Sequence, residues 1–281
     1  MNRFYFTEKD VLRLEAQAQQ LREDIITMIH AARAGHPGGS LSSVEMVTAL
    51  YFHVMNIDPE NPDWADRDRF IMSKGHSCPA MYAALARRGF FDPAILNTLR
   101  QYGSILQGHP DMHKVPGLDM SAGSLGNGLS VGVGMALSAK LHKQDYMTYV
   151  MLGDGEIQEG MVWEAAMAAA HHDLKNLVAI VDCNGVQING FTNEIMKVEP
   201  LADKWRAFGW QVVEIDGHDM ADILRGLHTA RMMRWPTAIL MRTVKGKGVS
   251  FMEDVAKWHG AATNEEETAI ALSEIEEGGI L

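Results

Sequence analysis

Residues 151–160, MLGDGEIQEG, hold an acidic residue between two glycines at the point where an apolar run ends. The run YMTYVMLG predicts a buried strand and residues 160–172 predict a helix, so Asp154 is expected at the carboxyl end of the strand. Gly153 and Gly155 permit unusual backbone angles and allow a bulky ligand to approach the chain closely. An isolated carboxylate at this position favours a bound cation.

A second polar residue ends the next predicted strand. The segment LVAIVDCNGVQING runs into Asn184, and the backbone carbonyl of Val186 follows shortly after it. Carboxylate, amide and carbonyl oxygens suit Mg²⁺, which takes one or two protein carboxylates and completes its shell with water and phosphate oxygens. GDG alone is a common turn, but its pairing with Asn184 after one helix and one strand is far more specific. Asp154, Asn184 and Val186 are therefore predicted to hold a metal that bridges to a diphosphate.

Strands and helices are predicted to alternate along the chain. Apolar residues at helical spacing predict a first helix from Thr7 to about Arg33, which is expected to stop at AGHPGGS. Further helices are expected in SVEMVTALYFHVM, near 79–87 and 93–100, and at 129–142, 160–172, 200–208 and 219–233. Predicted strands lie in RDRFIM, YMTYVMLG, LVAIVDC, WQVVEIDG and PTAILMRTV. Because these strands are apolar over most of their length, we expect an α/β fold, a parallel sheet with helices on both faces, in a single domain.

Composition excludes several classes of function. The formal net charge of −11 argues against a nucleic-acid binder or a binder of anionic membranes, since both need a basic surface. The charged amphipathic N-terminus lacks the apolar core of a signal peptide, and no apolar run is long enough to cross a bilayer. Two cysteines without a CxxC pair indicate neither a disulfide framework nor a zinc site. The sequence predicts a soluble, cytoplasmic protein.

Several further motifs combine with GDG and Asn184 to indicate a family. The segments GHPGGSLS, SKGHS, GHPD, GSLGNG, GDGEIQEG and WHG follow one another from the first helix to His259. In order and spacing the chain resembles transketolases, enzymes that use thiamine diphosphate. The resemblance implies the thiamine diphosphate-binding fold, with Mg²⁺ or another divalent cation such as Ca²⁺ or Mn²⁺.

The resemblance assigns the binding residues one by one. It implies that Asp154 and Asn184 hold the metal through their side chains and Val186 through its backbone carbonyl. In the GSLGNG segment it implies that backbone groups of Gly123 and Ser124 meet the cofactor and that Leu125 packs near the aminopyrimidine. The glycines of the GDG motif, Gly153 and Gly155, give room for the diphosphate. Lys74 and Lys245 match family positions near the cofactor, where a lysine can balance diphosphate charge.

The resemblance also implies a set of catalytic residues. Transketolases line the reaction centre with histidines from four motifs, which correspond here to His36, His76, His109 and His259. Such histidines hydrogen-bond sugar hydroxyls and move protons near neutral pH. Glu159 matches an acidic residue that lies in a carboxylate network at the family's dimer interface. Glu156 is expected only to favour the start of a helix.

The resemblance covers only the diphosphate-binding part of the transketolase architecture. Residues 1–281 are expected to form one such domain, while the pyrimidine-binding and C-terminal domains are expected on a separate chain. The predicted function is therefore transfer of a two-carbon ketol unit from a ketose phosphate to an aldose phosphate, by a heterotetramer that needs this partner subunit. The identity of donor and acceptor is carried mainly by the absent half.

Three alternatives stay open from the sequence. The α subunit of a 2-oxo acid dehydrogenase also carries GDG and Asn, although the histidine set favours transketolase. A fragment of a 1-deoxyxylulose-phosphate synthase is a second alternative, although such enzymes keep their domains in one chain. A non-catalytic diphosphate-binding subunit is the third, and retention of all four histidines argues against it.

Overall fold

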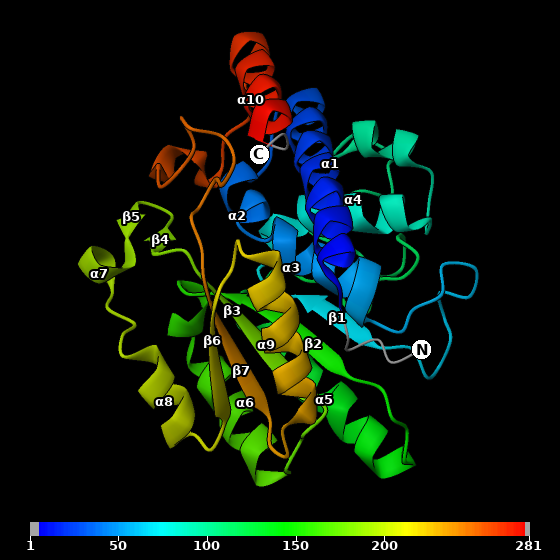
Figure 1. Ribbon diagram of the computed structural model, residues 1–281, viewed down its shortest axis with the longest axis vertical. Coiled ribbons are helices and arrows are strands. Elements are labelled where there is room, and N and C mark those ends of the chain that lie inside the picture. Colours follow the sequence, from blue (N-terminus) through cyan, green and yellow to red (C-terminus); the bar gives the residue numbers. More distant parts are fainter. Residues whose placement is uncertain (1–5, 279–281) are drawn as a thin grey trace.

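Five parallel strands form a sheet at the centre of the protein, between two layers of helices (Figure 1). The computed structural model describes residues 6–278. The strand order is β1-β2-β3-β7-β6. The bounds are β1 Arg69–Met72, β2 Thr148–Gly153, β3 Leu177–Cys183, β6 Gln211–Asp216 and β7 Thr237–Arg242. The predicted parallel α/β fold is confirmed, and the order places β2 and β3 side by side, with Gly153 opposite Asp182.

Alternate residues of the strands pack against different helical layers. In β2, Tyr149 and Met151 belong to one buried cluster, whereas Val150 and Leu152 belong to the other. A strand buried on both faces is apolar throughout, which explains the continuous apolar runs in the sequence.

Helices on both faces cover the sheet. The layer against Tyr149 contains α1 Glu8–Ala32, α3 Val44–Ala49, α4 Cys78–Arg88 and α9 Met220–Met232, and the opposite layer contains α5 Asn127–His142, α6 Gly160–His171 and α8 Leu201–Ala207. The closing acidic segment forms α10, Glu265–Gly278, which lies alongside α1 (Figure 1). In residues 6–278, none of the helices is long and apolar enough to span a bilayer.

Local chemistry sets the ends of α1 close to the predicted positions. Thr7 accepts a hydrogen bond from the Asp10 backbone N–H at 3.3 Å, and Asp10 Oδ2 accepts one from the Thr7 N–H at 2.9 Å. This reciprocal capping box fixes the start of the helix. Arg33 then adopts a left-handed conformation with φ of 50° and ends it.

The first helix ends before the GHPGG segment as predicted, but this segment also forms a short helix that was not predicted. Residues Pro37–Leu41 form a short buried helix, α2, because proline suits the first helical turn and the small residues fit a crowded site. A Cβ on Gly39 would lie 2.7 Å from Ser77 Oγ. After α3 the chain widens into a π-helical turn at Leu50–Val54, and Pro93–Thr98 forms a 3₁₀ helix.

One small unit was not predicted at all. The strands β4, Val186–Gln187, and β5, Gly190–Phe191, form a hairpin that leads into α7, Thr192–Ile195. This unit lies at one side of the molecule, beyond the end of β3 (Figure 1). Two-residue strands carry no periodic pattern, so the sequence gives no signal for them.

Candidate active site

Asp154 lies where the sequence placed it, directly after β2 and beside the loop that follows β3. Its Oδ2 accepts a hydrogen bond from the Gly185 N–H at 2.7 Å, and its Oδ1 accepts one from the Gly155 N–H at 2.8 Å. The residue is 4% exposed, and burial, with the charge of Asp182, raises the pKa of Asp154 to about 6. Within residues 6–278 no cationic side chain forms an ion pair with it. A buried carboxylate held only by backbone N–H groups is suited to a cation.

Asn184 and Val186 complete the predicted oxygen set at the same edge of the sheet. Asn184 follows β3, and its Oδ1 accepts a hydrogen bond from the Val186 N–H at 3.1 Å. The Val186 carbonyl accepts one from Lys245 Nζ at 2.8 Å, so a cation already faces this oxygen. In the described part of the chain, no group of three or more His, Cys, Asp or Glu side chains is placed to hold a metal. The candidate set has only one such side chain, Asp154, and relies on amide and carbonyl oxygens, which suits Mg²⁺.

The two glycines of the GDG motif differ in their surroundings. A Cβ on Gly155 would lie 3.1 Å from Gln187 Cβ, so the packing of the protein itself favours glycine there. A Cβ on Gly153 would meet nothing closer than 3.8 Å. The open space at Gly153 fits the predicted need for room beside a bulky ligand.

Asp182 organises the site and was not singled out from the sequence. The fully buried carboxylate accepts hydrogen bonds from four side chains in different segments: Ser42 Oγ at 2.6 Å, Asn184 Nδ2 at 2.9 Å, Lys74 Nζ and Thr243 Oγ1. These donors hold the pKa of Asp182 below its ordinary value although burial opposes ionisation. An acidic residue inside the apolar run LVAIVDC is the signal that identifies it, because a buried charge needs partners.

Lys74 and Lys245 lie in the site but have different surroundings. Lys74 forms a buried ion pair with Asp182 and donates to the Gly39 carbonyl at 2.9 Å. Its charge is therefore already paired, and contact with a diphosphate stays a prediction. Among the described residues, Lys245 Nζ hydrogen-bonds only neutral partners, the Val186 carbonyl and His259 Nδ1 at 2.9 Å. Burial together with Lys74 lowers the pKa of Lys245 to about 8.

Three of the four predicted histidines form one cluster. His36 directly precedes α2, while His76 and His259 lie in short 3₁₀ turns, and the three ring centroids are 5.0–5.5 Å apart. Burial lowers the pKa of His36 and of His259 to about 4, and burial with the charge of Lys74 lowers that of His76 to about 2. His36 Nδ1 is buried without a hydrogen-bond partner among the described residues. The cluster therefore offers neutral rings with free hydrogen-bonding capacity.

His109 stands apart from this cluster. It is exposed, and burial and Arg100 lower the pKa of the imidazole. A Cβ on Gly123 would lie 3.9 Å from its ring. The loop that carries Gly123 and Ser124, both exposed, and the half-buried Leu125 thus lies beside His109.

Glu156 has a larger role than the helix-start effect that the sequence suggested. It is buried, and its carboxylate accepts hydrogen bonds from Ser73 Oγ, from the Gly126 N–H at 2.9 Å and from the Gly153 N–H at 3.0 Å. Gly126 has a φ of 85°, which favours glycine. Glu156 thereby ties the GSLGNG loop to the end of β2. Glu159, in contrast, is exposed at the start of α6.

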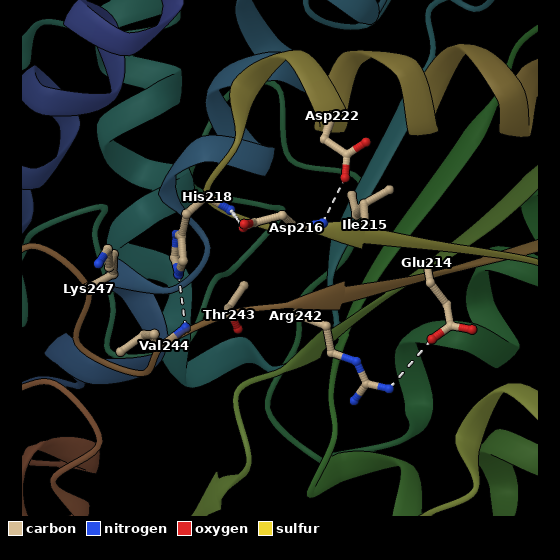
Figure 2. Close-up of a pocket in the computed structure, with 9 residues that line it drawn as sticks. All are labelled: Glu214, Ile215, Asp216, His218, Asp222, Arg242, Thr243, Val244 and Lys247. Atoms are coloured by element: carbon tan, nitrogen blue, oxygen red, sulfur yellow. Dashed lines mark hydrogen bonds and ion pairs between the residues drawn. The ribbon is translucent and has the colours of Figure 1, made fainter.

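A cavity of about 580 Å³ lies beside this site, at the carboxyl ends of β6 and β7 (Figure 2). Its lining includes His218, Thr243, Val244 and Lys247 but neither Asp154 nor Asn184. Thr243 connects the two regions, because its hydroxyl also binds Asp182. The cavity is thus adjacent to the candidate metal ligands and does not enclose them.

Comparison with known proteins decides between the families that carry this geometry. The model of the transketolase thiamine diphosphate-binding domain matches residues 15–275. The chain belongs to the transketolase family. The matched range includes the GDG motif, Asn184 and the whole histidine cluster.

Two relatives in the family are similar to this chain over nearly their whole length. One is a subunit of the apulose-4-phosphate transketolase of Phocaeicola vulgatus, which is 46% identical over 265 residues that cover 94% of each chain. The other is the 6-deoxy-6-sulfo-D-fructose transketolase subunit SqwG of a Clostridium species, which is 46% identical over 95% of this chain and 97% of its own length.

Longer transketolases match along only part of their length. The transketolase of Rattus norvegicus is 40% identical, over 88% of this chain and 39% of its own. The crystal structure of transketolase from Campylobacter jejuni superposes with a TM-score of 0.89 and 32% identity, over 94% of this chain and 42% of that one. This transketolase-family chain thus corresponds to the thiamine diphosphate-binding part of the longer enzymes.

Proposed function

We propose that this chain is the thiamine diphosphate-binding subunit of a two-subunit transketolase. The complex transfers a two-carbon ketol unit from a ketose phosphate to an aldose phosphate. The observation that carries the proposal is the oxygen site of Asp154, Asn184 and Val186 at adjacent strand ends, set beside a histidine cluster in a chain of this family. Residues 1–281 act as a single diphosphate-binding domain.

A separate partner subunit supplies the rest of the active site in this proposal. Two relatives are each named as one subunit of a transketolase, and this chain covers 94–97% of their length. In contrast, this chain covers only 39–42% of the length of the longer transketolases. We infer a partner that carries the pyrimidine-binding and C-terminal domains, in a heterotetramer. Glu159, exposed at the start of α6, is assigned to the interface. Both free cysteines are buried, which fits a reducing cytoplasm.

The metal and the diphosphate are assigned to the residues that present oxygen and positive charge. A divalent cation, with Mg²⁺ preferred, would be held by Asp154, Asn184 and the Val186 carbonyl, and Lys245, whose Nζ faces that carbonyl, would balance the charge of the diphosphate. Gly123, Ser124, Leu125, Gly153 and Gly155 line the cofactor. Thiamine diphosphate, when bound, supplies the nucleophilic carbon and the electron sink for the two-carbon unit.

The histidines position the sugar and carry protons. With pKa values of His36 and His259 near 4, both rings are neutral at pH 7. His36 Nδ1 has no partner among the described residues, whereas His259 Nδ1 already contacts Lys245, so His259 offers its other nitrogen to a sugar hydroxyl. A neutral ring accepts a proton from a hydroxyl at one nitrogen and returns it later, as ketol transfer requires. His109, exposed beside Gly123, is assigned to the entrance of the site.

The substrate is a sugar phosphate or a related ketose. The relatives named above act on apulose 4-phosphate and on 6-deoxy-6-sulfo-D-fructose according to their names, so equally similar subunits serve different sugars. Pentose phosphates are the starting choice for an assay, which extends to branched and sulfonated ketoses.

The test is co-expression of this chain with its neighbouring reading frame, followed by purification and calorimetry. We expect a complex that binds thiamine diphosphate in the presence of Mg²⁺ and transfers two-carbon units from one donor in the panel, while the single chain has no turnover. Asp154→Ala in the complex is expected to abolish cofactor uptake, and His142→Asn on the exposed end of α5 serves as a matched control. A complex that decarboxylates 2-oxo acids, or one that binds the cofactor without turnover, contradicts the proposal.

A further inference from the structure

The loop that carries Lys245 is held at two points, one on each side of that residue. The Val244 N–H donates to His218 Nε2 at 2.9 Å (Figure 2), and Arg22 Nε donates to the Lys247 carbonyl at 3.2 Å. His218 lies between β6 and α9, and Arg22 lies on α1. Segments far apart in the sequence thus converge on one short stretch of loop.

A single carboxylate joins these two anchors. Glu45 on α3 is buried; its Oε1 forms an ion pair with Arg22, and its Oε2 lies 3.3 Å from His218 Nδ1. Burial opposes ionisation, but Arg22 and His218 hold the pKa of Glu45 below its ordinary value. Glu45 is therefore a charged group whose two oxygens face Arg22 and His218, the two residues that bind the loop.

Hydrogen bonding fixes the tautomer of His218. The Val244 N–H is a donor, so Nε2 must be the acceptor and a neutral ring carries its proton on Nδ1, facing Glu45. Among the described residues, neither His218 Nδ1 nor Glu45 Oε2 has a hydrogen-bond partner, and both atoms are buried. The 3.3 Å between them is therefore a polar contact outside hydrogen-bond geometry.

Lys245, between the two anchors, reaches the candidate site. Its Nζ donates to the Val186 carbonyl and contacts His259 Nδ1. A third anchor, the Gly246 N–H to the Gly38 carbonyl at 3.1 Å, ties the same loop to the segment after His36. A shift of Val244 or Lys247 therefore moves Lys245 relative to the oxygens assigned to the metal.

We propose that His218 and Arg22, which both face the buried carboxylate of Glu45, clamp the loop on either side of Lys245 and so position Lys245 for the diphosphate. His218 and Arg22 are positioning residues, since neither touches the candidate ligand oxygens. The proposal rests on the proposed function, because it needs a cofactor for Lys245 to meet. It adds residues from α1, α3 and the β6–α9 loop to the site.

The experiment compares the contributions of the two ring nitrogens of His218 to cofactor binding by the assembled complex. His218→Gln places a carboxamide oxygen near the position of Nε2, so it still accepts from Val244. His218→Asn places an amide nitrogen near Nδ1, so it still faces Glu45 but loses the Val244 bond. We expect the Kd for thiamine diphosphate, measured by calorimetry with Mg²⁺, to rise about fivefold in His218→Asn and to stay within about twofold in His218→Gln.

Two further measurements keep the test independent of folding defects and of activity. Hydrogen exchange of the peptide that contains Val244, measured on the single chain, should be faster in His218→Asn than in His218→Gln or wild type. Arg22→Lys, which keeps the charge beside Glu45 but loses the Nε donor, should also weaken cofactor binding about fivefold. His142→Asn should match wild type in both measurements.

The outcomes separate this proposal from the proposed function. Uptake of cofactor by the wild-type complex, with equal constants for the two His218 variants, overturns the positioning role alone. Equal exchange rates at Val244 in the two variants overturn it as well. A wild-type complex that takes up no thiamine diphosphate overturns the proposed function, and the positioning role fails with it.

Discussion

Asn184 Nδ2 donates to Asp182 Oδ2 at 2.9 Å, so a buried carboxylate two residues earlier sets which atom of the asparagine faces the candidate metal site. The carboxamide has two ends that differ only in N and O, and Asp182 accepts only from the nitrogen. Asn184 Oδ1 is thereby left on the side of Val186. The same Asp182 oxygen also accepts from Ser42 and Lys74, so α2 and the end of β1 depend on it.

Replacing Asp182 should cost much of the stability of the chain. In Asp182→Asn, Lys74 loses its counter-charge while it stays buried, and breaking such a pair costs about 3–5 kcal/mol. Lys74→Met leaves Asp182 uncompensated and should cost a similar amount. The double variant should lose clearly less than the sum, because neither charge remains. Urea unfolding of the wild type, the two single variants and the double variant measures this coupling. Strictly additive losses would contradict an energetic link between Asp182 and Lys74.

Asp154→Asn should separate stability from cofactor binding. Burial and Asp182 raise the pKa of Asp154 to about 6, so above pH 6 the ionised carboxylate opposes folding by roughly 3 kcal/mol. The asparagine removes this charge but loses one acceptor for a backbone N–H, which offsets about 1–3 kcal/mol. At pH 7.5 we expect the free energy of unfolding of the cofactor-free chain to be equal to wild type or up to about 2 kcal/mol higher.

The same variant should bind the cofactor poorly. Loss of the only carboxylate among the assigned metal ligands should weaken uptake of thiamine diphosphate with Mg²⁺ by about a hundredfold, as calorimetry on the complex can measure. The stability advantage should shrink between pH 6 and 4, where Asp154 becomes protonated in the wild-type fold. A variant that is both less stable and normal in cofactor binding contradicts the assignment.

The sequence predicts the fold well because strand and helix periodicity carry most of it. The five strands of the sheet and the long helices lie within a few residues of the predicted ranges, since their apolar patterns are continuous. The hairpin of Val186–Gln187 and Gly190–Phe191 was missed because it is too short to show a pattern. The helix Pro37–Leu41 was missed because two glycines normally end a helix, and here close packing against Ser77 and Lys245 selects them.

Only the site residues that belong to recognisable sequence motifs could be predicted. The GDG motif and Asn184 identify a site of oxygen ligands. No local sequence pattern predicts that Asp182 accepts hydrogen bonds from four side chains, or that Glu45 lies between Arg22 and His218. Most of those contacts join residues that are far apart in the sequence, so only the folded chain brings them together. Glu156 shows the same limit: its helix-start position was visible, while its bonds to Gly126 and Gly153 depend on the tertiary fold.

Glu156 and Glu159 provide a matched pair of carboxylates three residues apart. Glu156→Ala leaves the buried N–H of Gly126 and the half-buried N–H of Gly153 without their acceptor, so we expect a loss of about 3 kcal/mol of stability. The Kd for the cofactor should also rise, because the GSLGNG loop is released. Glu159→Ala removes an exposed side chain and should change stability by less than about 0.5 kcal/mol. Urea unfolding of the single chain compares them directly. Equal losses in the two variants would show that the Glu156 bonds contribute little.

The histidine cluster should make stability depend on pH in the slightly acidic range. Burial and Lys74 lower the pKa of His76 to about 2, whereas the ring titrates near 6.5 in the unfolded chain. Below pH 6.5 the unfolded state therefore binds a proton that the folded state does not. The stability contributed by His76 is fully present above pH 6.5 and is lost as the pH falls, by at most about 1.4 kcal/mol per pH unit.

His76→Gln isolates this effect, because the neutral glutamine cannot titrate. Between pH 7.5 and pH 5.0 the wild-type chain should lose up to about 2 kcal/mol more than the variant in urea unfolding. Asp154, whose raised pKa acts in the opposite direction between pH 4 and 6, contributes equally to both proteins and cancels in the difference. Parallel stability curves would mean that His76 titrates normally in the fold. The neutral hydrogen-bonding role assigned to it beside His36 and His259 would then be wrong, because a charged ring there would repel Lys74 and Lys245.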